Sequence, residues 1–218
     1  MDADWSVELG ADDGALEFPW ASPDGTQRYI DLQRQPELLR EIPEAARFPE
    51  LGEFLLAINT ASAPWLTAKC DIWMEGICGT EAPSLGAAGY GAAETVPFQS
   101  AGFALKLCSY VDLVFREGDT RFSFARHEQW VKSAARGLSG DDELPVVCEF
   151  IVRRCWYHPE VSTLREFDDT SSPDGENPLP GFYVTCYLFG YGDDEAQTRT
   201  RWAAGLRRVT AVLTALAT

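Results

Sequence analysis

The fold is decided by residues 182–218, which read FYVTCYLFGYGDDEAQTRTRWAAGLRRVTAVLTALAT. The first part alternates apolar residues with polar and aromatic ones, which is typical of a strand with one apolar face. Its apolar positions are Phe182, Val184, Cys186 and Leu188. The second part repeats apolar residues at steps of four, three, four and three, as an amphipathic helix does, at Trp202, Leu206, Val209, Leu213 and Leu216. A strand that leads into such a helix predicts helices packed on a sheet.

The same patterns predict further elements along the chain. Apolar alternation predicts strands at 5–9, 15–20, 67–75, 103–115 and 145–158, and helical periodicity predicts helices at 49–59 and 124–138. Pro36 and Pro43, each followed by Glu, predict two short helical turns before the first of these helices. In the strand at 67–75, the shared apolar face would hold Ala68, Cys70, Ile72 and Met74. The adjacent Arg153 and Arg154 interrupt the alternation and predict a bulge or a sheet edge there.

This order of elements defines a fold class. Because strands that follow one another in sequence usually pair, we expect an α+β fold whose sheet is mainly antiparallel, with about four to six strands. The helices would pack on one face of it, as a two-layer sandwich. We expect one domain over residues 1–218, with flexible insertions at about 76–102 and 159–181, where Gly, Ala, Pro and Asp accumulate without a period. Whether the acidic N-terminal segment joins the sheet is left open by the sequence.

The charge balance restricts the classes of partner. Acidic residues number 34 against 18 basic ones, for a net charge of −16. A field of this sign repels nucleic acids and anionic membranes, so we expect neither as a partner, and it favours a basic protein partner or self-association. The acids are dense in the first 25 residues, whereas residues 196–218 carry four arginines and no acid. We expect the acidic leader to dock near this basic helix, in the same chain or in a second copy, unless both merely face solvent.

The chain carries no sign of export and no catalytic or metal motif. The N-terminus lacks a signal peptide and no apolar run is long enough to span a bilayer, so a cytoplasmic protein is expected. We do not expect Cys148, Cys155 and His158 to form a metal site, because Cys155 and His158, three apart on a strand, point to opposite faces unless the strand bends. The six cysteines, which lie at 70, 78, 108, 148, 155 and 186, are expected to be free thiols of the core. We therefore predict no catalytic residue, metal or cofactor.

The best candidate site is the sheet face that points away from the predicted helices. It combines both signs of charge with aromatic residues, which suits a ligand surface or a protein interface. The alternative is an ordinary solvated face, or one covered by the N-terminal segment. The candidate binding residues are Asp71, Trp73, Lys106, Tyr110, Asp112, Glu149, Arg153, Tyr157, Tyr183 and Tyr187.

These features favour a non-catalytic binding or adaptor protein with an acidic surface. In charge and element order the chain resembles acidic secretion chaperones, which bind an effector segment, and acidic immunity proteins, which neutralise basic toxins. Both resemblances imply a protein–protein interaction. Two alternatives stay open. One is a small-molecule-binding protein or enzyme whose pocket is lined by Tyr110, Asp112, Glu149, Arg153 and Tyr187. The other is a structural subunit that buries its tyrosine-rich strand between copies.

Overall fold

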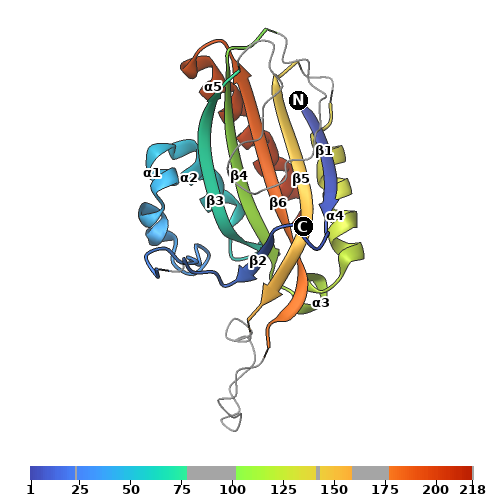
Figure 1. The fold of residues 1–218 in the computed structure, drawn as a ribbon. Helices are drawn as coiled ribbons and strands as arrows, with labels where there is room; N and C mark the ends of the chain where they lie inside the picture. Colours follow the sequence, from blue (N-terminus) through green and yellow to red (C-terminus); the bar gives the residue numbers. More distant parts are fainter. Residues whose placement is uncertain (23, 78–101, 141–142, 159–176, 218) are drawn as a thin grey trace.

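The structure is a computed structural model that describes residues 1–22, 24–77, 102–140, 143–158 and 177–217 (Figure 1). Its strands are β1 (Asp2–Glu8), β2 (Ala15–Phe18), β3 (Trp65–Gly76), β4 (Leu105–Phe115), β5 (Val146–Tyr157) and β6 (Leu179–Gly192). Its helices are η1 (Pro36–Glu41), α1 (Pro43–Arg47), α2 (Pro49–Ile58), α3 (Gly118–Arg121), α4 (Phe124–Leu138) and α5 (Glu195–Leu216). The insertions predicted at about 76–102 and 159–181 fall largely outside the described residues.

The strands form one sheet in the order β1-β5-β6-β4-β3, and β2 pairs with β5 beyond the end of β1. The pairs β3–β4, β4–β6 and β5–β6 are antiparallel, whereas β1 and β2 run parallel to β5. The predicted α+β fold with a mainly antiparallel sheet is therefore confirmed. The acidic N-terminal segment belongs to the sheet, a point that the sequence left open.

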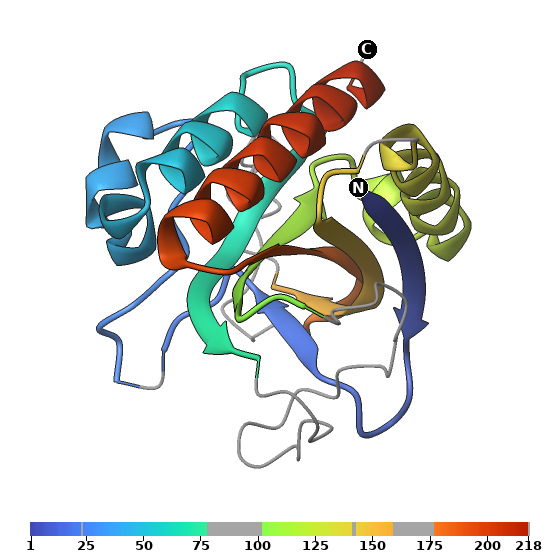
Figure 2. The same cartoon turned by 90° about the horizontal axis from the view of Figure 1, so that it is seen from above.

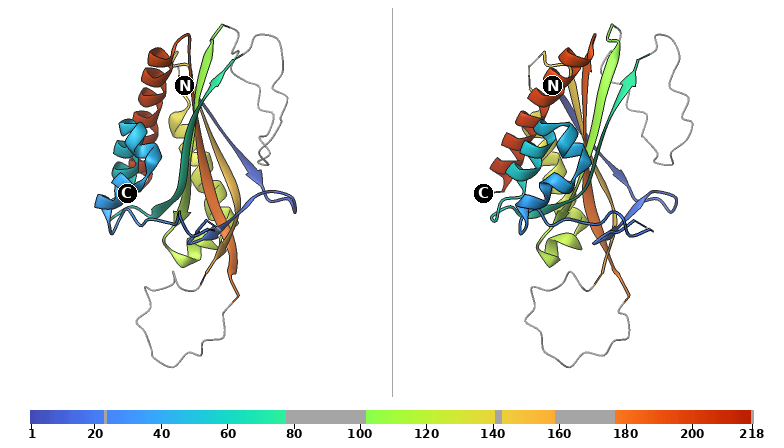
Figure 3. Two further views of the ribbon diagram at one scale, coloured as in Figure 1. Left: turned by 60° about the vertical axis from the view of Figure 1, so that its left-hand side comes forward. Right: turned by 90° about the vertical axis from the view of Figure 1, so that its left-hand side faces the viewer.

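The main core lies between the sheet and a layer of helices. Figure 3 shows α2, α4 and α5 on one side of the sheet, and their apolar residues form one buried cluster with the inner faces of β4, β5 and β6. Trp202 of α5 is fully buried at the centre and donates a hydrogen bond from Nε1 to Ser109 Oγ, at 2.8 Å. Ser109 is the one polar residue on the apolar face of β4, and this bond explains its presence. Gly190 allows the close approach of Trp202, because a Cβ at position 190 would lie 2.6 Å from Trp202 Cβ.

Local capping signals fix the starts of the two long helices. α4 begins directly after Ser123, whose Oγ accepts a hydrogen bond from the backbone N–H of Arg126. α5 begins after Asp194, whose carboxylate accepts the N–H of Gln197 at 2.8 Å. Four of the described cysteines are buried and all five are free, as predicted, although Cys70 is only partly buried. Cys78 lies outside the described residues.

The bulge or edge predicted at Arg153 and Arg154 is wrong. β5 pairs without a register shift with β6 on one side and with β1 and β2 on the other. Arg153 is tolerated because side chains of neighbouring strands bind its guanidinium, and Arg154 projects to the exposed surface where β1 ends. The irregularity lies instead in β3, between Thr67 and Cys70. It turns Ala68 to the face opposite Cys70, so the predicted shared face is also wrong at this residue.

The second face of the sheet is partly covered by the N-terminal segment. Figure 2 shows the sheet as an arc, with helices outside it and β2 on its inner side. Leu16, Phe18, Trp20 and Tyr29, here called the N-terminal cover, pack on this face in a second, smaller core. The strand residues in that core are Leu66, Ala68, Val114, Cys155, Tyr157 and Tyr183. Two of the candidate binding residues, Tyr157 and Tyr183, are thus buried beneath the cover.

Candidate functional site

The part of the second face beyond the N-terminal cover is the candidate site, here called the polar-aromatic face. Strand register places Asp71 beside Tyr110, Tyr110 beside Tyr187, and Tyr187 beside Glu149. These four side chains therefore form one row across β3, β4, β6 and β5. In the next row Asp112 pairs with Thr185 of β6. The structure thus brings together most of the residues predicted from alternation alone.

Aromatic rings form a continuous platform on this face. The ring centroids of Trp73 and Tyr110 lie 6.4 Å apart, and those of Tyr110 and Tyr187 lie 5.7 Å apart. The ring of Tyr187 stacks on Phe189 at 5.8 Å with an interplanar angle of 8°. All four rings are partly exposed. Partly exposed aromatic rings give a binding surface a large contact area at a low cost in side-chain entropy.

Next to this platform, a series of hydrogen-bonded polar side chains connects β1, β5, β6 and β4. Arg153 of β5 donates from Nε and Nη2 to Glu8 Oε2 of β1, at 2.8 and 2.7 Å. Its Nη1 donates to Thr185 Oγ1 of β6 at 3.0 Å and to the Tyr187 hydroxyl at 3.3 Å. Thr185 in turn donates to Asp112 Oδ1 of β4 at 2.7 Å. We call Glu8, Arg153, Thr185 and Asp112 the polar chain; it connects the N-terminal strand to the centre of the sheet.

Two carboxyl groups here bind protons more tightly than usual. Burial raises the pKa of Asp112 to about 6, against an ordinary value of 3.8, although the Thr185 hydroxyl and the positive charge of Arg153 oppose the shift. Burial also raises the pKa of Glu149, and the negative charges of Glu8 and Asp4 add to that effect. Buried carboxyl groups with raised pKa values mark candidate functional sites, although structural networks produce them too.

Two cations of this face are ion-paired, whereas Lys69 lies over the ring of Trp20, 4.7 Å from its centroid, and forms no ion pair with a described residue. Lys106 Nζ lies 2.7 Å from Glu75 Oε2 and 5.3 Å from the ring centroid of Phe189, and Arg153 is held by Glu8. Asp71 and Glu149 take part in no ion pair within the part of the chain that the structure describes. The row across the sheet therefore has a carboxyl group without an ion pair at each end and two tyrosines between them. Asp71 is exposed, whereas Glu149 is buried and accepts a hydrogen bond from Ser6 Oγ at 3.2 Å.

Two combinations of cysteine and histidine are not brought together in the part of the chain that the structure describes. Cys108 and His127, which would be a thiol and a base if they met, lie on opposite sides of the sheet, because His127 is on the inner side of α4. No group of three or more metal-binding side chains occurs among the described residues. Cys148 faces the main core and Cys155 the second core, so the C-x6-C-x2-H pattern does not converge.

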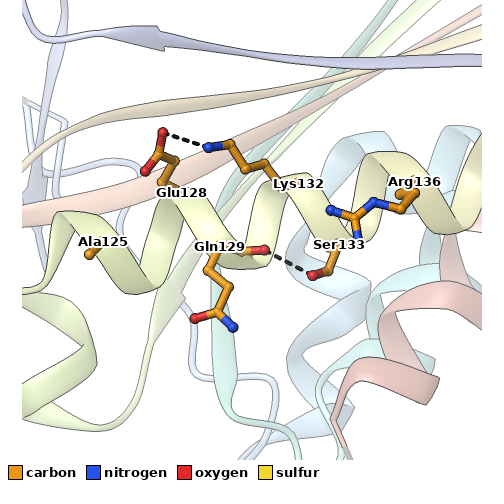
Figure 4. A pocket seen from close by; sticks show the side chains of 6 residues that line it. All are labelled: Ala125, Glu128, Gln129, Lys132, Ser133 and Arg136. Carbon is orange, nitrogen blue, oxygen red and sulfur yellow. Dashed lines mark hydrogen bonds and ion pairs between the residues drawn. The ribbon is translucent and has the colours of Figure 1, made fainter.

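Two open hollows lie on the helical side rather than on the polar-aromatic face. The larger, of about 320 Å³, follows the solvent-facing side of α4 (Figure 4). It is lined by Ala125, Glu128, Gln129, Lys132, Ser133 and Arg136. Figure 4 shows the ion pair of Glu128 and Lys132 lying along this surface, at 2.8 Å. The smaller hollow, of about 220 Å³, lies between α2 and α5. All six residues of the larger hollow come from one helix, so it is a groove in an exposed surface and not an enclosed pocket.

The acidic leader does not dock on the basic C-terminal helix within the described chain. Arg199 of α5 forms a bidentate pair with Glu50 of α2, at 2.9 and 2.7 Å, and Arg201 donates to the backbone oxygen of Tyr191. The leader is held elsewhere, because β1 pairs with β5 and Glu8 binds Arg153. The prediction that the acidic leader contacts the basic helix of the same chain is therefore wrong. Backbone pairing of β1 with β5 fixes the position of the leader instead.

Sequence reasoning missed Glu8 and Thr185. Thr185 lies on the predicted polar face of its strand, so alternation could have identified it. Glu8 could not be found in this way, because its role depends on the pairing of β1 with β5.

Comparison with known proteins adds no family to this description. None of the described helices has both the length and the apolar character needed to cross a bilayer. No protein-family model, curated protein or solved structure matches the chain.

Proposed function

We propose that this chain is a non-catalytic binding protein that holds a basic protein segment on its polar-aromatic face. The observation that carries the proposal is the row of Asp71, Tyr110, Tyr187 and Glu149. Its two end carboxyl groups have no ion-pair partner among the described residues. Arg and Lys side chains bind carboxylates and also pack on tyrosine rings, so one basic segment could use the whole row.

The geometry of the row sets the spacing of the groups it would bind. Asp71 and Glu149 lie on strands separated by two others, which places their backbones about 14 Å apart at the usual strand spacing. A segment that crosses the strands would therefore need basic side chains at about that distance. The net charge of −16 would accelerate the approach of such a partner at low salt.

The proposal can be tested with peptides selected from a random library displayed on phage. We expect the selected peptides to be richer in Lys and Arg than the starting library and to bind more weakly as salt increases. The variant Asp71→Asn/Glu149→Gln should weaken binding at least about tenfold, because it removes the ionisable carboxyl groups at both ends of the row. The matched control is Glu41→Gln/Glu53→Gln, which removes two exposed acids from the helical side. Selected peptides without basic enrichment, or equal losses in both double variants, would overturn the proposal.

A second candidate is a small-molecule-binding protein. The observation that favours it is the position of Tyr110, Arg153 and Tyr187 around Asp112, a carboxyl group whose pKa is about 6, with Glu149 beside Tyr187 in the neighbouring row. Such a group could bind a cationic or hydrogen-bond-donating ligand. A fragment library screened by ligand-observed NMR tests this candidate. Hits that disappear in Asp112→Asn and persist in the helical-side control would support it, and hits unaffected by Asp112→Asn would refute it.

A further inference from the structure

We infer that the basic partner is also held by a second, extended stretch of its chain, which pairs as an added strand with the edge of β3 from Ile72 to Gly76. No described strand pairs with this edge. This inference rests on the proposed function and specifies how the partner would be held. Main-chain hydrogen bonds to a sheet edge are a common mode of peptide recognition, in which side chains of alternate residues provide the specificity.

The orientation of the β3 backbone follows from one hydrogen bond. Ile77 N–H donates to the backbone oxygen of Ala104 at 2.8 Å, directly beyond the last paired residues of β3 and β4. In an antiparallel ladder alternate residues bond to the same neighbour, so residues 71, 73 and 75 also face β4. Ile72, Met74 and Gly76 therefore direct their N–H and C=O groups away from β4. In agreement, the N–H of Ile72 is bound by the side chain of Asp71, at 2.7 Å, and not by β4.

The other half of the same edge is already closed. The N–H of Thr67 donates to Asn59 Oδ1 at 3.2 Å, and Asn59 Nδ2 donates back to Thr67 Oγ1 at 2.8 Å. The backbone oxygen of Ala68 accepts a hydrogen bond from Trp20 Nε1 at 2.6 Å. Side chains thus block strand addition up to the bulge. Beyond the bulge, among the described residues, one hydrogen bond occupies an outward-facing backbone group of β3. It runs from the N–H of Ile72 to the carboxylate of Asp71.

The side chains beside the open edge define the partner. Asp71, Trp73 and Glu75 point to the polar-aromatic face, whereas Ile72 and Met74 point to the helical side and pack on the main core. An added strand would place its own alternate side chains on the same two faces. A segment that alternates basic and apolar residues therefore fits the edge, with its basic residues next to the two carboxylates.

A second copy of this chain fits the edge poorly. An antiparallel pair of two β3 edges over residues 71–75 would place Asp71 directly opposite Glu75 of the other copy. Like charges in directly opposite positions destabilise a strand pair. The charges of the edge thus favour a basic partner over self-association.

The experiment uses a labelled peptide of sequence Lys-Val-Lys-Val-Lys-Val-Lys and measures its affinity by fluorescence anisotropy. Met74→Pro removes an edge N–H without breaking a bond to β4, and Met74→Ala keeps that N–H while losing the same side chain. We expect Met74→Pro to bind the peptide at least about tenfold more weakly than wild type, and Met74→Ala to bind within about twofold.

Two methylated peptides make the test independent of any variant's folding. One carries N-methyl groups on its valines and the other on its lysines, so each blocks one edge of the added strand. Strand addition predicts that one peptide loses binding to the wild-type protein while the other keeps it. If both methylated peptides bind like the parent and Met74→Pro has no effect, the edge inference is overturned while the proposed function stands. If this peptide fails to bind but library-selected basic peptides bind, the inference is again overturned. If no basic peptide binds, the proposed function fails as well.

Discussion

Replacing Asp112 by asparagine should remove part of the pH dependence of stability. The pKa of Asp112 is about 6 in the folded protein, against an ordinary value of 3.8, because the carboxyl group is buried. The folded chain therefore binds this proton more tightly than the unfolded chain. The resulting stabilisation is complete below pH 3.8 and is lost as the pH rises through 6. The two pKa values correspond to a total of about 3 kcal/mol.

Asparagine keeps the shape of the side chain and can still accept the hydrogen bond of Thr185, but it does not titrate. We therefore expect the difference in free energy of unfolding between Asp112→Asn and wild type to change with pH. Linkage gives a change of about 1.4 kcal/mol in favour of the variant between pH 5 and pH 7.5. Urea unfolding followed by circular dichroism at these two pH values measures it. The raised pKa of Glu149 acts in both proteins and cancels in the comparison.

The control for this prediction is Asp71→Asn, which removes an exposed carboxylate from the same face. Its stability difference from wild type should stay nearly constant between the two pH values. A difference for Asp112→Asn that is equally constant, or that favours wild type at pH 7.5, would refute the assignment of a buried, tightly protonated carboxyl group at this position.

Three other substitutions probe the polar chain and the packing of α5. Glu8→Gln should lower the free energy of unfolding by about 1–3 kcal/mol, because Arg153 stays buried without its counter-charge; urea unfolding and amide exchange in β1 measure this. Ser109→Ala should cost about 1–3 kcal/mol in urea unfolding, because the buried Trp202 N–H loses its acceptor. Gly190→Ala should cost about 1–3 kcal/mol and lower the melting temperature, because its Cβ would lie 2.9 Å from the Trp202 backbone.

Each of these substitutions has a matched control. Asp4→Asn changes an exposed acid of the same strand as Glu8 and should be neutral within about 0.5 kcal/mol. Gly76→Ala meets no atom within 4 Å and should be similarly neutral, so an equal loss at both glycines would contradict the steric argument. For Ser109→Ala, a double-mutant cycle with Trp202→Phe isolates the hydrogen bond. A coupling energy near zero would show that the indole N–H does not depend on Ser109.

The elements that the sequence predicted well are those whose signals are local. The helix at 124–138 has its period, its Ser123 cap and its end within one short stretch, and the structure reproduces these bounds. The alternation in β4 and β6 placed Tyr110, Asp112 and Tyr187 correctly on one face, because the side chains of a regular strand alternate strictly.

The features that were missed depend on contacts between distant segments. The bulge in β3 has no glycine or proline to mark it, and it turned Ala68 away from its predicted face. The charge pattern suggested that the leader binds the arginine-rich helix, whereas backbone pairing with β5 decides its position. For the same reason Glu8 could not be recognised as the partner of Arg153, although Arg153 itself was a candidate.

The central position of β5 has a consequence for synthesis of the chain. β5 pairs with β1, β2 and β6, and the ion pair that joins β1 to it links residues 145 apart in sequence. At about 5–20 residues per second, a ribosome would make Arg153 roughly 7–30 s after Glu8. During that interval the N-terminal strands have no neighbour to pair with, and the sheet cannot close around its centre. Assembly of the whole sheet therefore depends on its last third, and a chain stopped before β5 would leave its acidic N-terminal segment unpaired.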